Sequence, residues 1–217
     1  MSRLFKIGLI VFASGLLVAC TSKGGGRYKV DTIQPAVLKP YNFWTYAGGY
    51  KDEVLAPNRF KVEVAASGST TYERAVAILM TRAAEMAQAS GNTVFVIDRI
   101  QLSMRCFYSA PAHLREMGSA AGLPTAKIEV TAQPDNTFPD DALVFSVRKV
   151  LDVLHPVVAT VEDKPGLERA IISQNDAICR MSESQRLAAI GPMPWNNHDI
   201  VEKAGATAPS PELVIGS

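Results

Sequence analysis

The sequence predicts an α+β fold with two layers, in which a small mixed β-sheet of three or more strands carries helices on one face. Three observations support this class. Two short runs alternate apolar and polar residues, a long stretch between them has helical periodicity, and turn signals separate the segments. The resulting order of strand, helix, strand, strand, helix is that of a two-layer domain.

Three strands are predicted. Residues 59–66 alternate apolar and charged side chains, as a half-buried strand does. Residues 93–97 are almost entirely apolar, which predicts a strand covered on both faces. Beyond Asp98 the apolar residues alternate up to Tyr108, so one long strand with a bulge or bend near Asp98 is expected. Residues 127–133 alternate again and should pair back as a hairpin.

Three helices are predicted. The first begins at Thr70, whose spacing to Glu73 is that of a capping box. The second runs from about Asp140 to the His-Pro pair that ends at Pro156. The third begins at Pro165, because proline is favoured in a first helical turn. The apolar stripe of this third helix, expected to pack on the core, consists of Leu167, Ala170, Ile171, Ile178 and Met181.

The first nineteen residues have the features of a signal peptide. Arg3 and Lys6 form a basic start, and residues 7–19 form an apolar run that is too short to span a bilayer. The run leads into Leu-Val-Ala-Cys at residues 17–20, which fits a lipobox. Residues 1–19 therefore predict a lipoprotein signal peptide, with N-acyl and S-diacylglycerol chains on Cys20. The alternative is an ordinary secretory signal or uncleaved anchor with an incidental cysteine.

The residue after the lipobox and the overall charge indicate where the chain acts. Thr21 is not the acidic residue that would favour retention in the inner membrane, so the outer membrane, facing the periplasm, is expected. Without the leader the formal net charge is about −1, and no stretch concentrates Lys and Arg. The lipid therefore makes the membrane a partner, whereas nucleic acid is not expected to be one.

The chain divides into five parts by composition. Residues 1–19 are the signal peptide, and residues 20–57 are the lipidated cysteine followed by a tether or extended segment. Residues 58–158 form the α+β core domain, and residues 159–191 form a C-terminal helical segment. Residues 192–217 are rich in Pro, Ala and Gly and are expected to be a disordered tail.

Two cysteines remain after lipidation. Cys106 and Cys179 would lie in an oxidising compartment, where a disulfide is the usual state and would stabilise the fold by ~4 kcal/mol in the chain-entropy model. The alternative is that Cys106 is a buried, small apolar residue of its alternating strand. No base is visibly paired with either cysteine, so a catalytic thiol is not predicted.

Aromatic residues mark candidate interaction surfaces. They are Tyr41, Phe43, Trp44 and Tyr46, which precede a Gly-Gly pair, and Trp195 in a Pro-rich stretch. Such rings could contact a protein partner or stack on sugar rings. Alternatively, they cover a sheet edge or pack onto the core. The sheet face that the helices leave open is a further candidate surface.

No motif predicts a catalytic or metal site. The three histidines are scattered, and no HExxH or CxxC spacing occurs. Asp135, Asp140 and Asp141 lack the spacing of a calcium loop and are better explained by turns and helix caps. Arg82 and Glu85 are three residues apart on the first helix, which predicts a surface ion pair.

Several short motifs between Gly49 and Leu151 carry a resemblance. They are Gly49-Tyr50, Asn58-Arg59-Phe60-Lys61-Val62, Thr71-Tyr72-Glu73-Arg74-Ala75, Thr81-Arg82-Ala83-Ala84-Glu85, Gly91 and Phe95-Val96-Ile97-Asp98, with a closing segment near Asp141-Ala142 and from Val147 to Leu151. With these motifs the chain resembles a family of small, uncharacterised proteobacterial envelope lipoproteins. The resemblance covers about half of the mature chain and implies a lipid-anchored α+β protein, with no assigned reaction. The chain differs from that family at residues 65–67 and beyond residue 160.

These observations favour a non-catalytic, lipid-anchored binding module that faces the periplasm and contacts another envelope component, foremost a protein. The alternative is a glycan or small-molecule binder in envelope maintenance or stress. A hydrolase is less favoured, because it would need a Ser or Cys beside His113 or His155. No cofactor is expected apart from the covalent lipid.

Overall fold

The computed structural model of the chain describes residues 35–41, 48–109, 118, 120–134, 137–161, 165–205 and 212–215. Its strands are β1 (Gly49–Ala56), β2 (Arg59–Ala65), β3 (Val94–Tyr108), β4 (Ala120–Gln133), β5 (Val144–Ser146), β6 (Val201–Lys203) and β7 (Glu212–Ile215). Its helices are α1 (Tyr72–Ala89), α2 (Val147–Ala159), α3 (Pro165–Ile178), α4 (Glu183–Ala189) and α5 (Pro194–Asn197). The α+β class is confirmed.

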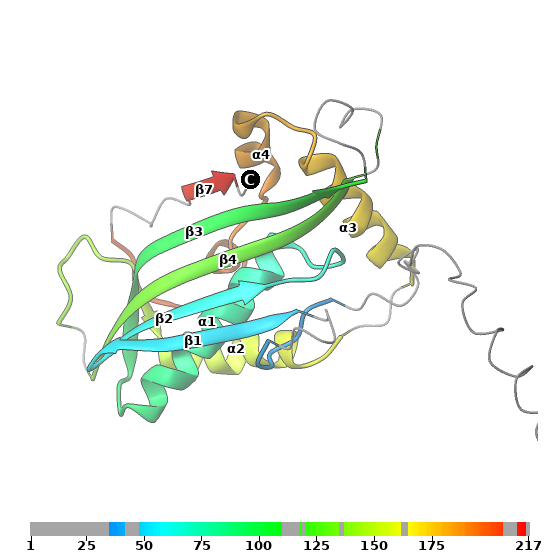
Figure 1. Cartoon of the computed structure of the whole chain (residues 1–217). Coiled ribbons are helices and arrows are strands. Elements are labelled where there is room, and N and C mark those ends of the chain that lie inside the picture. The colour runs from blue at the N-terminus through cyan, green and yellow to red at the C-terminus, as the bar shows by residue number, and fades with distance from the viewer. Residues whose placement is uncertain are drawn as a thin grey trace, which may run out of the picture.

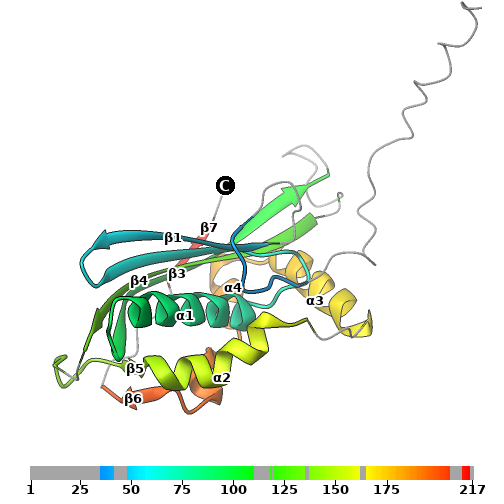
Figure 2. The same ribbon diagram turned by 90° about the horizontal axis from the view of Figure 1, so that it is seen from below.

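The strands form one curled sheet that resembles half of a barrel (Figure 1). Along the order β1-β2-β4-β3-β5-β6 each strand is antiparallel to its neighbour, and β7 pairs in parallel with β3, so the sheet is mixed as predicted. Helix α1 packs on the inner face of this sheet, and α2 packs on α1 on the side away from the sheet, so α2 forms a third layer where only two layers were predicted (Figure 2).

Alternation places one set of strand residues against the helices. Every second residue of β4, from Ala120 to Ala132, faces inward, while its neighbours are only half buried or exposed. The same alternation buries the inward side chains of β2 and of β3. Large side chains of this core with less than 2% exposure include Ile78, Leu79, Ile100, Leu102, Ile128 and Leu154.

Asp98 forms the predicted bulge in the long strand β3. Ile97 pairs with Val130 and Arg99 pairs with Glu129, so Asp98 is the extra residue on β3. The extra residue shifts the side-chain alternation by one position. The apolar run before Asp98 is continuous for another reason, since Val94 and Val96 belong to a second apolar cluster, which covers the other face of the strand there as predicted. The hairpin that β3 forms with β4 is confirmed as well.

Helix α1 begins one residue later than the capping box predicted. Thr71 is the N-cap, and its hydroxyl accepts a hydrogen bond from the Arg74 backbone N–H at 3.1 Å. Thr70 is fully buried, and its hydroxyl accepts from the backbone N–H of Ala36 at 2.8 Å. The Thr70 side chain therefore holds residues 35–41 against the core and is not available to cap the helix.

Helix α2 begins later and ends later than predicted. Residues 144–146, expected to be helical, form β5 at the edge of β3, and Ser146 then caps the helix. Pro156 lies inside α2, which continues to Ala159. Proline removes one backbone donor, but Pro156 is exposed and lies in the last turn, where few further helical bonds depend on it.

The predicted domain boundaries are wrong at both ends of the core. Ala36 is fully buried and β1 begins at Gly49, so part of the expected tether 20–57 belongs to the domain. Within the expected disordered tail 192–217, the described residues form α5, β6 and β7, and Ile200 is fully buried. A few apolar side chains of this segment, such as Met193 and Ile200, are buried in the core, although the composition of residues 192–217 is typical of disorder. The signal peptide and Cys20 lie outside the described residues.

The outer face of the sheet, here called the open face, is charged. One row of neighbours across the strands is Glu53, Lys61, Glu129 and Arg99, and the next row is Lys51, Glu63, Lys127 and Gln101. Opposite charges alternate along each row as far as the neutral Gln101, and the Lys61 ammonium lies 2.8 Å from the Glu53 carboxylate. The charges of these two rows therefore largely neutralise one another.

Candidate functional site

A groove of about 620 Å³ lies where the start of α1, the end of α2 and the first half of α3 meet. We call it the Pro35 groove. Its apolar lining consists of Pro35, Pro156, Val157, Val161, Leu167 and Ile171. Concave, mainly apolar surfaces with a few polar groups are the usual form of binding sites in proteins.

Two of these lining side chains are unusually exposed. Leu167 is 53% exposed and Val157 is 47% exposed. Ala170, which lies on α3 with Leu167, is exposed as well. The prediction that the α3 stripe packs on the core is thus wrong for the first half of the helix. Contiguous exposed apolar side chains of this kind mark surfaces that bind partners.

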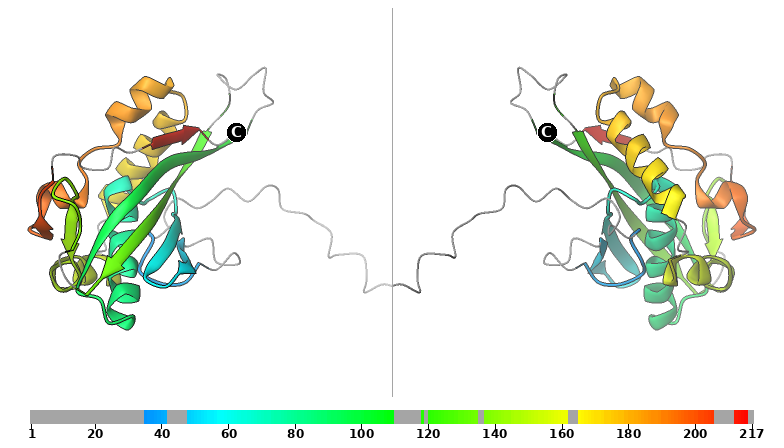
Figure 3. Two further views of the ribbon diagram at one scale, coloured as in Figure 1. Left: turned by 90° about the vertical axis from the view of Figure 1, so that its left-hand side faces the viewer. Right: turned by 90° about the vertical axis from the view of Figure 1, so that its right-hand side faces the viewer.

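The position of α3 explains this exposure. The second half of the helix lies on β4, where a Cβ atom on Gly122 would come within 2.2 Å of the Asn175 carbonyl oxygen. Only glycine permits this close approach. The Gly122 N–H also donates to the Asp176 carboxylate at 2.9 Å. The first half of α3 extends past the end of the sheet, so its apolar residues have less core to cover them (Figure 2), while Figure 3 shows the same helix alongside α4.

Arg74 on α1 fixes the wall of the groove. Its guanidinium donates to the carbonyl oxygens of Ala36 at 2.8 Å, Val157 at 2.9 Å and Thr160 at 2.7 Å. Two of these carbonyls belong to the last turn of α2 and the residue after it, where helix carbonyls lack partners and a cation is favourable. Sequence reasoning missed this role, because the acceptors lie 38, 83 and 86 residues away.

A cluster of buried polar side chains lies next to the groove, and one of its members, Ser69, lines it. Ser67 bonds to both Ser69 at 3.2 Å and Thr70 at 2.9 Å. The Asn175 side chain donates to the Gly68 carbonyl at 2.7 Å and to the Thr70 carbonyl at 2.9 Å. These hydroxyls are at most 2% exposed. The Ser-Gly-Ser loop therefore joins α3 to the core, and its hydroxyls are used in structural hydrogen bonds.

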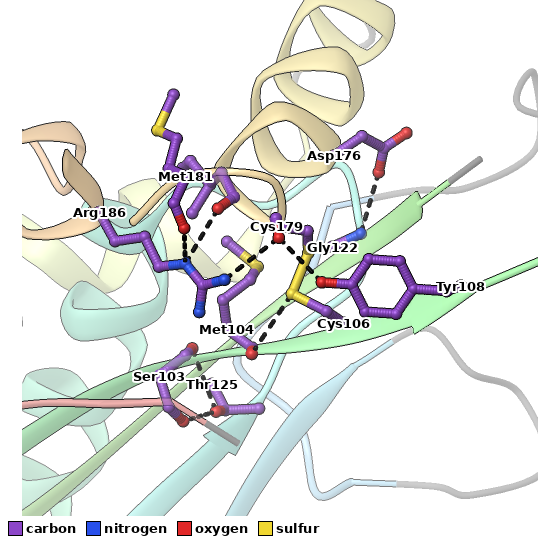
Figure 4. Close-up of a disulfide and its surroundings, with 11 residues drawn as sticks. Ser103, Met104, Cys106, Tyr108, Gly122, Thr125, Asp176, Cys179, Met181 and Arg186 are labelled. Atoms are coloured by element: carbon purple, nitrogen blue, oxygen red, sulfur yellow. Dashed lines mark hydrogen bonds between the residues drawn. A yellow bond between two sulfur atoms is a disulfide. The ribbon is translucent and has the colours of Figure 1, made fainter. Parts of the chain in front are cut away.

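Cys106 and Cys179 are joined by a disulfide that links β3 to the end of α3 (Figure 4). The Tyr108 hydroxyl donates to the Cys179 carbonyl at 2.8 Å, and the buried Arg186 guanidinium donates to the same oxygen at 3.1 Å. The bond is consistent with an oxidising, extracytoplasmic compartment. In the described part of the chain, no helix is long and apolar enough to span a membrane.

Of the predicted aromatic cluster, only Tyr41 is described, and Phe43, Trp44 and Tyr46 lie outside the described residues. The Lys51 ammonium lies 5.1 Å from the centre of the Tyr41 ring. Both residues line a hollow of about 220 Å³ on the open face, together with Glu63, Ala65 and Arg105. We call this the Tyr41 hollow.

Trp195 is a part of the core packing. Its ring lies 5.7 Å from that of Phe145, a fully buried side chain of β5, and Trp195 itself is half buried. This position does not support the predicted interaction surface around Trp195. The structural alternative, in which the ring packs onto the core, fits it better.

A charged cluster lies where α1 meets the edge strand β1. The predicted pair of Arg82 and Glu85 is confirmed at 2.7 Å, and Arg82 also binds the Asp52 carboxylate. The guanidinium lies 4.8 Å from the centre of the Tyr50 ring, and burial raises the pKa of the Tyr50 hydroxyl. His155 approaches Glu85 at 4.0 Å. Because the Arg82 guanidinium already has two carboxylate partners, this cluster joins the elements and does not form an open charged site.

The residues weighed above for metal binding are only partly described. Asp140 pairs with Lys203 at 2.9 Å, and this lysine holds the pKa of the Asp140 carboxyl below its usual range. Asp135 and His113 lie outside the described residues. Among the residues that are described, no group of three or more His, Cys, Asp or Glu side chains could hold a metal ion.

Comparisons of the chain with models of protein families, with curated proteins and with solved structures found no match. The functional assignment therefore depends on the chain's own residues. Of its surfaces, the Pro35 groove combines a defined hollow with exposed apolar side chains, and the Tyr41 hollow combines an aromatic ring with two cations and one carboxylate.

Proposed function

We propose that the chain is a lipid-anchored, non-catalytic binding module of the bacterial envelope, attached through Cys20 to the outer membrane and facing the periplasm. The lipobox at residues 17–20 supports the anchor, and the disulfide is consistent with an extracytoplasmic location. The ligand in this proposal is an apolar segment of another envelope protein.

The observation that carries the binding role is the exposed apolar first half of α3 in the Pro35 groove. When a partner covers Leu167 and Val157, their apolar surface is removed from water, which favours binding. Pro35 lines the groove and lies fifteen positions after Cys20. The groove would therefore lie within about 55 Å of the lipid. A partner at the same membrane would meet it at a raised local concentration.

The anchor is tested first with Cys20→Ala in cells. Metabolic labelling with an alkyne fatty acid should mark the wild-type chain and not the variant. The variant should also leave the membrane fraction. A wild-type chain without label, or a variant that stays labelled, would contradict the lipid anchor.

The groove is tested by site-specific photo-crosslinking in cells. A photo-crosslinking residue at position 167 should capture an envelope protein, and the same residue at position 55 should not. Leu55 is a matched control, because it is a leucine with 40% exposure that lies on β1. Leu167→Glu should abolish capture by a crosslinker at position 157. Equal capture from positions 167 and 55, or none from 167, would contradict the proposal.

A second candidate function is glycan binding at the Tyr41 hollow. Its geometry favours an anionic sugar, because a ring can stack on the sugar while Lys51 and Arg105 face its acid group. Retention of the soluble Cys20→Ala form on peptidoglycan, lost in Arg105→Ala, would support this function. Lack of retention would count against it without bearing on the groove.

A further inference from the structure

The open face of the sheet carries charges of both signs in a regular order. In the strand order β1, β2, β4 and β3, its first row is Glu53, Lys61, Glu129 and Arg99, and its second row is Lys51, Glu63, Lys127 and Gln101. The sign alternates along each row as far as the neutral Gln101. It also alternates along β1, β2 and β4, where the two charges of each strand are two residues apart and point to the same face. We call the residues of these two rows the charge checkerboard.

The second row differs from the first in its ion pairs. In the first row, Lys61 lies 2.8 Å from Glu53, and Glu129 lies 3.2 Å from Arg59. Within the part of the chain that the structure describes, no ion pair includes the three charges of the second row, which are Lys51, Glu63 and Lys127. Lys51 and Glu63 are exposed. A second molecule can therefore bring an opposite charge to the second row without breaking an ion pair there.

The charge checkerboard is complementary to itself. A two-fold axis that lies between the two rows and runs across the strands turns the first row of one copy onto the second row of another. Each strand then lies over its own equivalent. Every lysine of the three strands faces a glutamate of the other copy, in the pairs Lys51–Glu53, Lys61–Glu63 and Lys127–Glu129. Because such an interface is symmetric, each of these pairs forms twice.

A two-fold axis along the strands, between β2 and β4, complements the charges less well. It would place Lys51 opposite the neutral Gln101 of the other copy. It would also pair Glu63 with Lys127 of the other copy, although these two residues are already neighbours within one chain. The axis across the strands, in contrast, gives each of the three charges of the second row an opposite charge. The order of charges therefore favours the axis across the strands.

We propose that the open face binds a second copy of this chain through the charge checkerboard, about a two-fold axis that runs across the strands. The open face is the outer side of a curled sheet, so two copies touch over a limited area (Figure 2). A small interface of exposed ion pairs is weak and sensitive to salt. Lys51 and Glu63 also line the Tyr41 hollow, so a second copy and a glycan would compete there. The proposal depends neither on the lipid anchor nor on the Pro35 groove.

The test detects contact between two copies of the full chain that carry different epitope tags and are produced in the same cells. A water-soluble carbodiimide joins a lysine to a carboxylate in direct contact, so it traps a weak complex covalently in the broken cells. Capture through one tag under denaturing conditions is followed by measurement of the other tag. The wild type should give a crosslinked dimer. Salt raised from about 0.1 to about 1 M should lower its yield several-fold, because the Debye length falls from about 10 to about 3 Å.

An exchange of charge between the two copies tests the arrangement. Lys61→Glu in both copies sets carboxylates against each other, and Glu63→Lys in both copies sets ammonium groups against each other. Each change should lower the yield of dimer several-fold. One copy with Lys61→Glu and the other with Glu63→Lys should recover it, because opposite charges then face each other again. Asp152→Lys, the same change of charge on an exposed residue of α2, is the matched control and should have no effect.

The proposal is overturned if the wild-type copies give no dimer, if neither single change lowers the yield, or if the exchanged copies fail to recover it. Recovery by Lys61→Glu against Glu129→Lys would overturn the proposed axis, because that exchange suits the axis along the strands. Circular dichroism checks that each variant is folded. Lys51→Glu against Glu53→Lys repeats the exchange on the edge strand β1, where both residues are exposed, and should give the same loss and recovery.

Discussion

Removing the disulfide should lower the free energy of unfolding by about 4.5 kcal/mol. The perturbation is the double substitution Cys106→Ala and Cys179→Ala. The two cysteines are 73 residues apart in sequence. In the chain-entropy model a loop of 15 residues is worth about 3 kcal/mol and one of 100 residues about 4.7 kcal/mol, which places this loop near the upper value.

The surroundings of the disulfide favour a loss close to this value. The end of α3 keeps three hydrogen bonds from Arg186, which donates to the carbonyls of Ile178, Cys179 and Met181. It also keeps the hydrogen bond from Tyr108 to Cys179. Because these contacts do not need the bond, the native structure should persist and the main effect should fall on the unfolded chain.

Urea denaturation at equilibrium measures this effect. The oxidised wild type, the wild type with reductant and the double variant are compared. The slope of the free energy of unfolding against urea concentration reports how much surface each protein exposes on unfolding. Agreement between the reduced wild type and the variant would assign the loss to the bond and not to the two side chains. A loss below about 1 kcal/mol, with native structure retained, would refute the reasoning.

Three further predictions concern buried or paired polar groups. Among the described residues the Tyr72 hydroxyl is buried without a hydrogen-bond partner, and burial holds its pKa well above the usual range. Tyr72→Phe should therefore leave the free energy of unfolding, measured by thermal denaturation, unchanged or raise it by up to about 1 kcal/mol. A clear decrease would show that the hydroxyl has a hydrogen-bond partner. Asn175→Ala removes both donors to the buried carbonyls of Gly68 and Thr70 and should cost about 2–3 kcal/mol in urea denaturation, whereas a loss under 1 kcal/mol would show that the cluster relaxes. The pKa of Glu53 is lowered from 4.5, first by the hydrogen bond from Lys61 and then by its charge, so the contribution of this pair is present at neutral pH and is lost as pH falls from 4.5 through the lowered pKa. Lys61→Met should move that pKa back toward 4.5 in an NMR titration, and an unchanged value would exclude the pair as its cause.

The parts of the fold that sequence predicts are those with a long, uninterrupted pattern. The alternation in β2 and the stripe of α1 each extend over several residues and depend on one covered face, and the change of pattern at Asp98 marks where β3 stops being covered on both faces. Burial on that face determines the choice of residue at each position. The cause of each helix or strand therefore lies within its own residues, so its hydrophobic pattern is enough to predict it.

Short strands and caps are predicted poorly, because their partners are remote. β5 and β6 have three residues each, too few to show a period; β5 forms on the edge of β3, and β6 then forms on the edge of β5. Likewise, Thr70 has the right spacing to cap α1, yet its hydroxyl binds Ala36, 34 residues earlier. No local rule contains such a contact, so the capping position moved by one residue.

The Pro35 groove could not be predicted for a related reason. Leu167, Ala170 and Ile171 have the spacing of a core stripe, and such a pattern does not say whether the helix has a sheet beneath it. The end of the sheet under α3 decides which half of the stripe is covered. The only signal in the sequence is the stripe itself, which is equally consistent with packing and with binding.

The attachment of α3 ties stability to the proposed binding role. The described side chains of this helix that are fully buried are Asn175 and Ile178, so apolar burial alone holds it weakly. Specific contacts compensate: the disulfide at its end, Asn175 on the loop before α1, and the Asp176 carboxylate on β4. All three lie in or just after the second half of the helix. They fix α3 without covering its first half, and for that reason Leu167 can remain exposed in a helix that is nevertheless firmly placed.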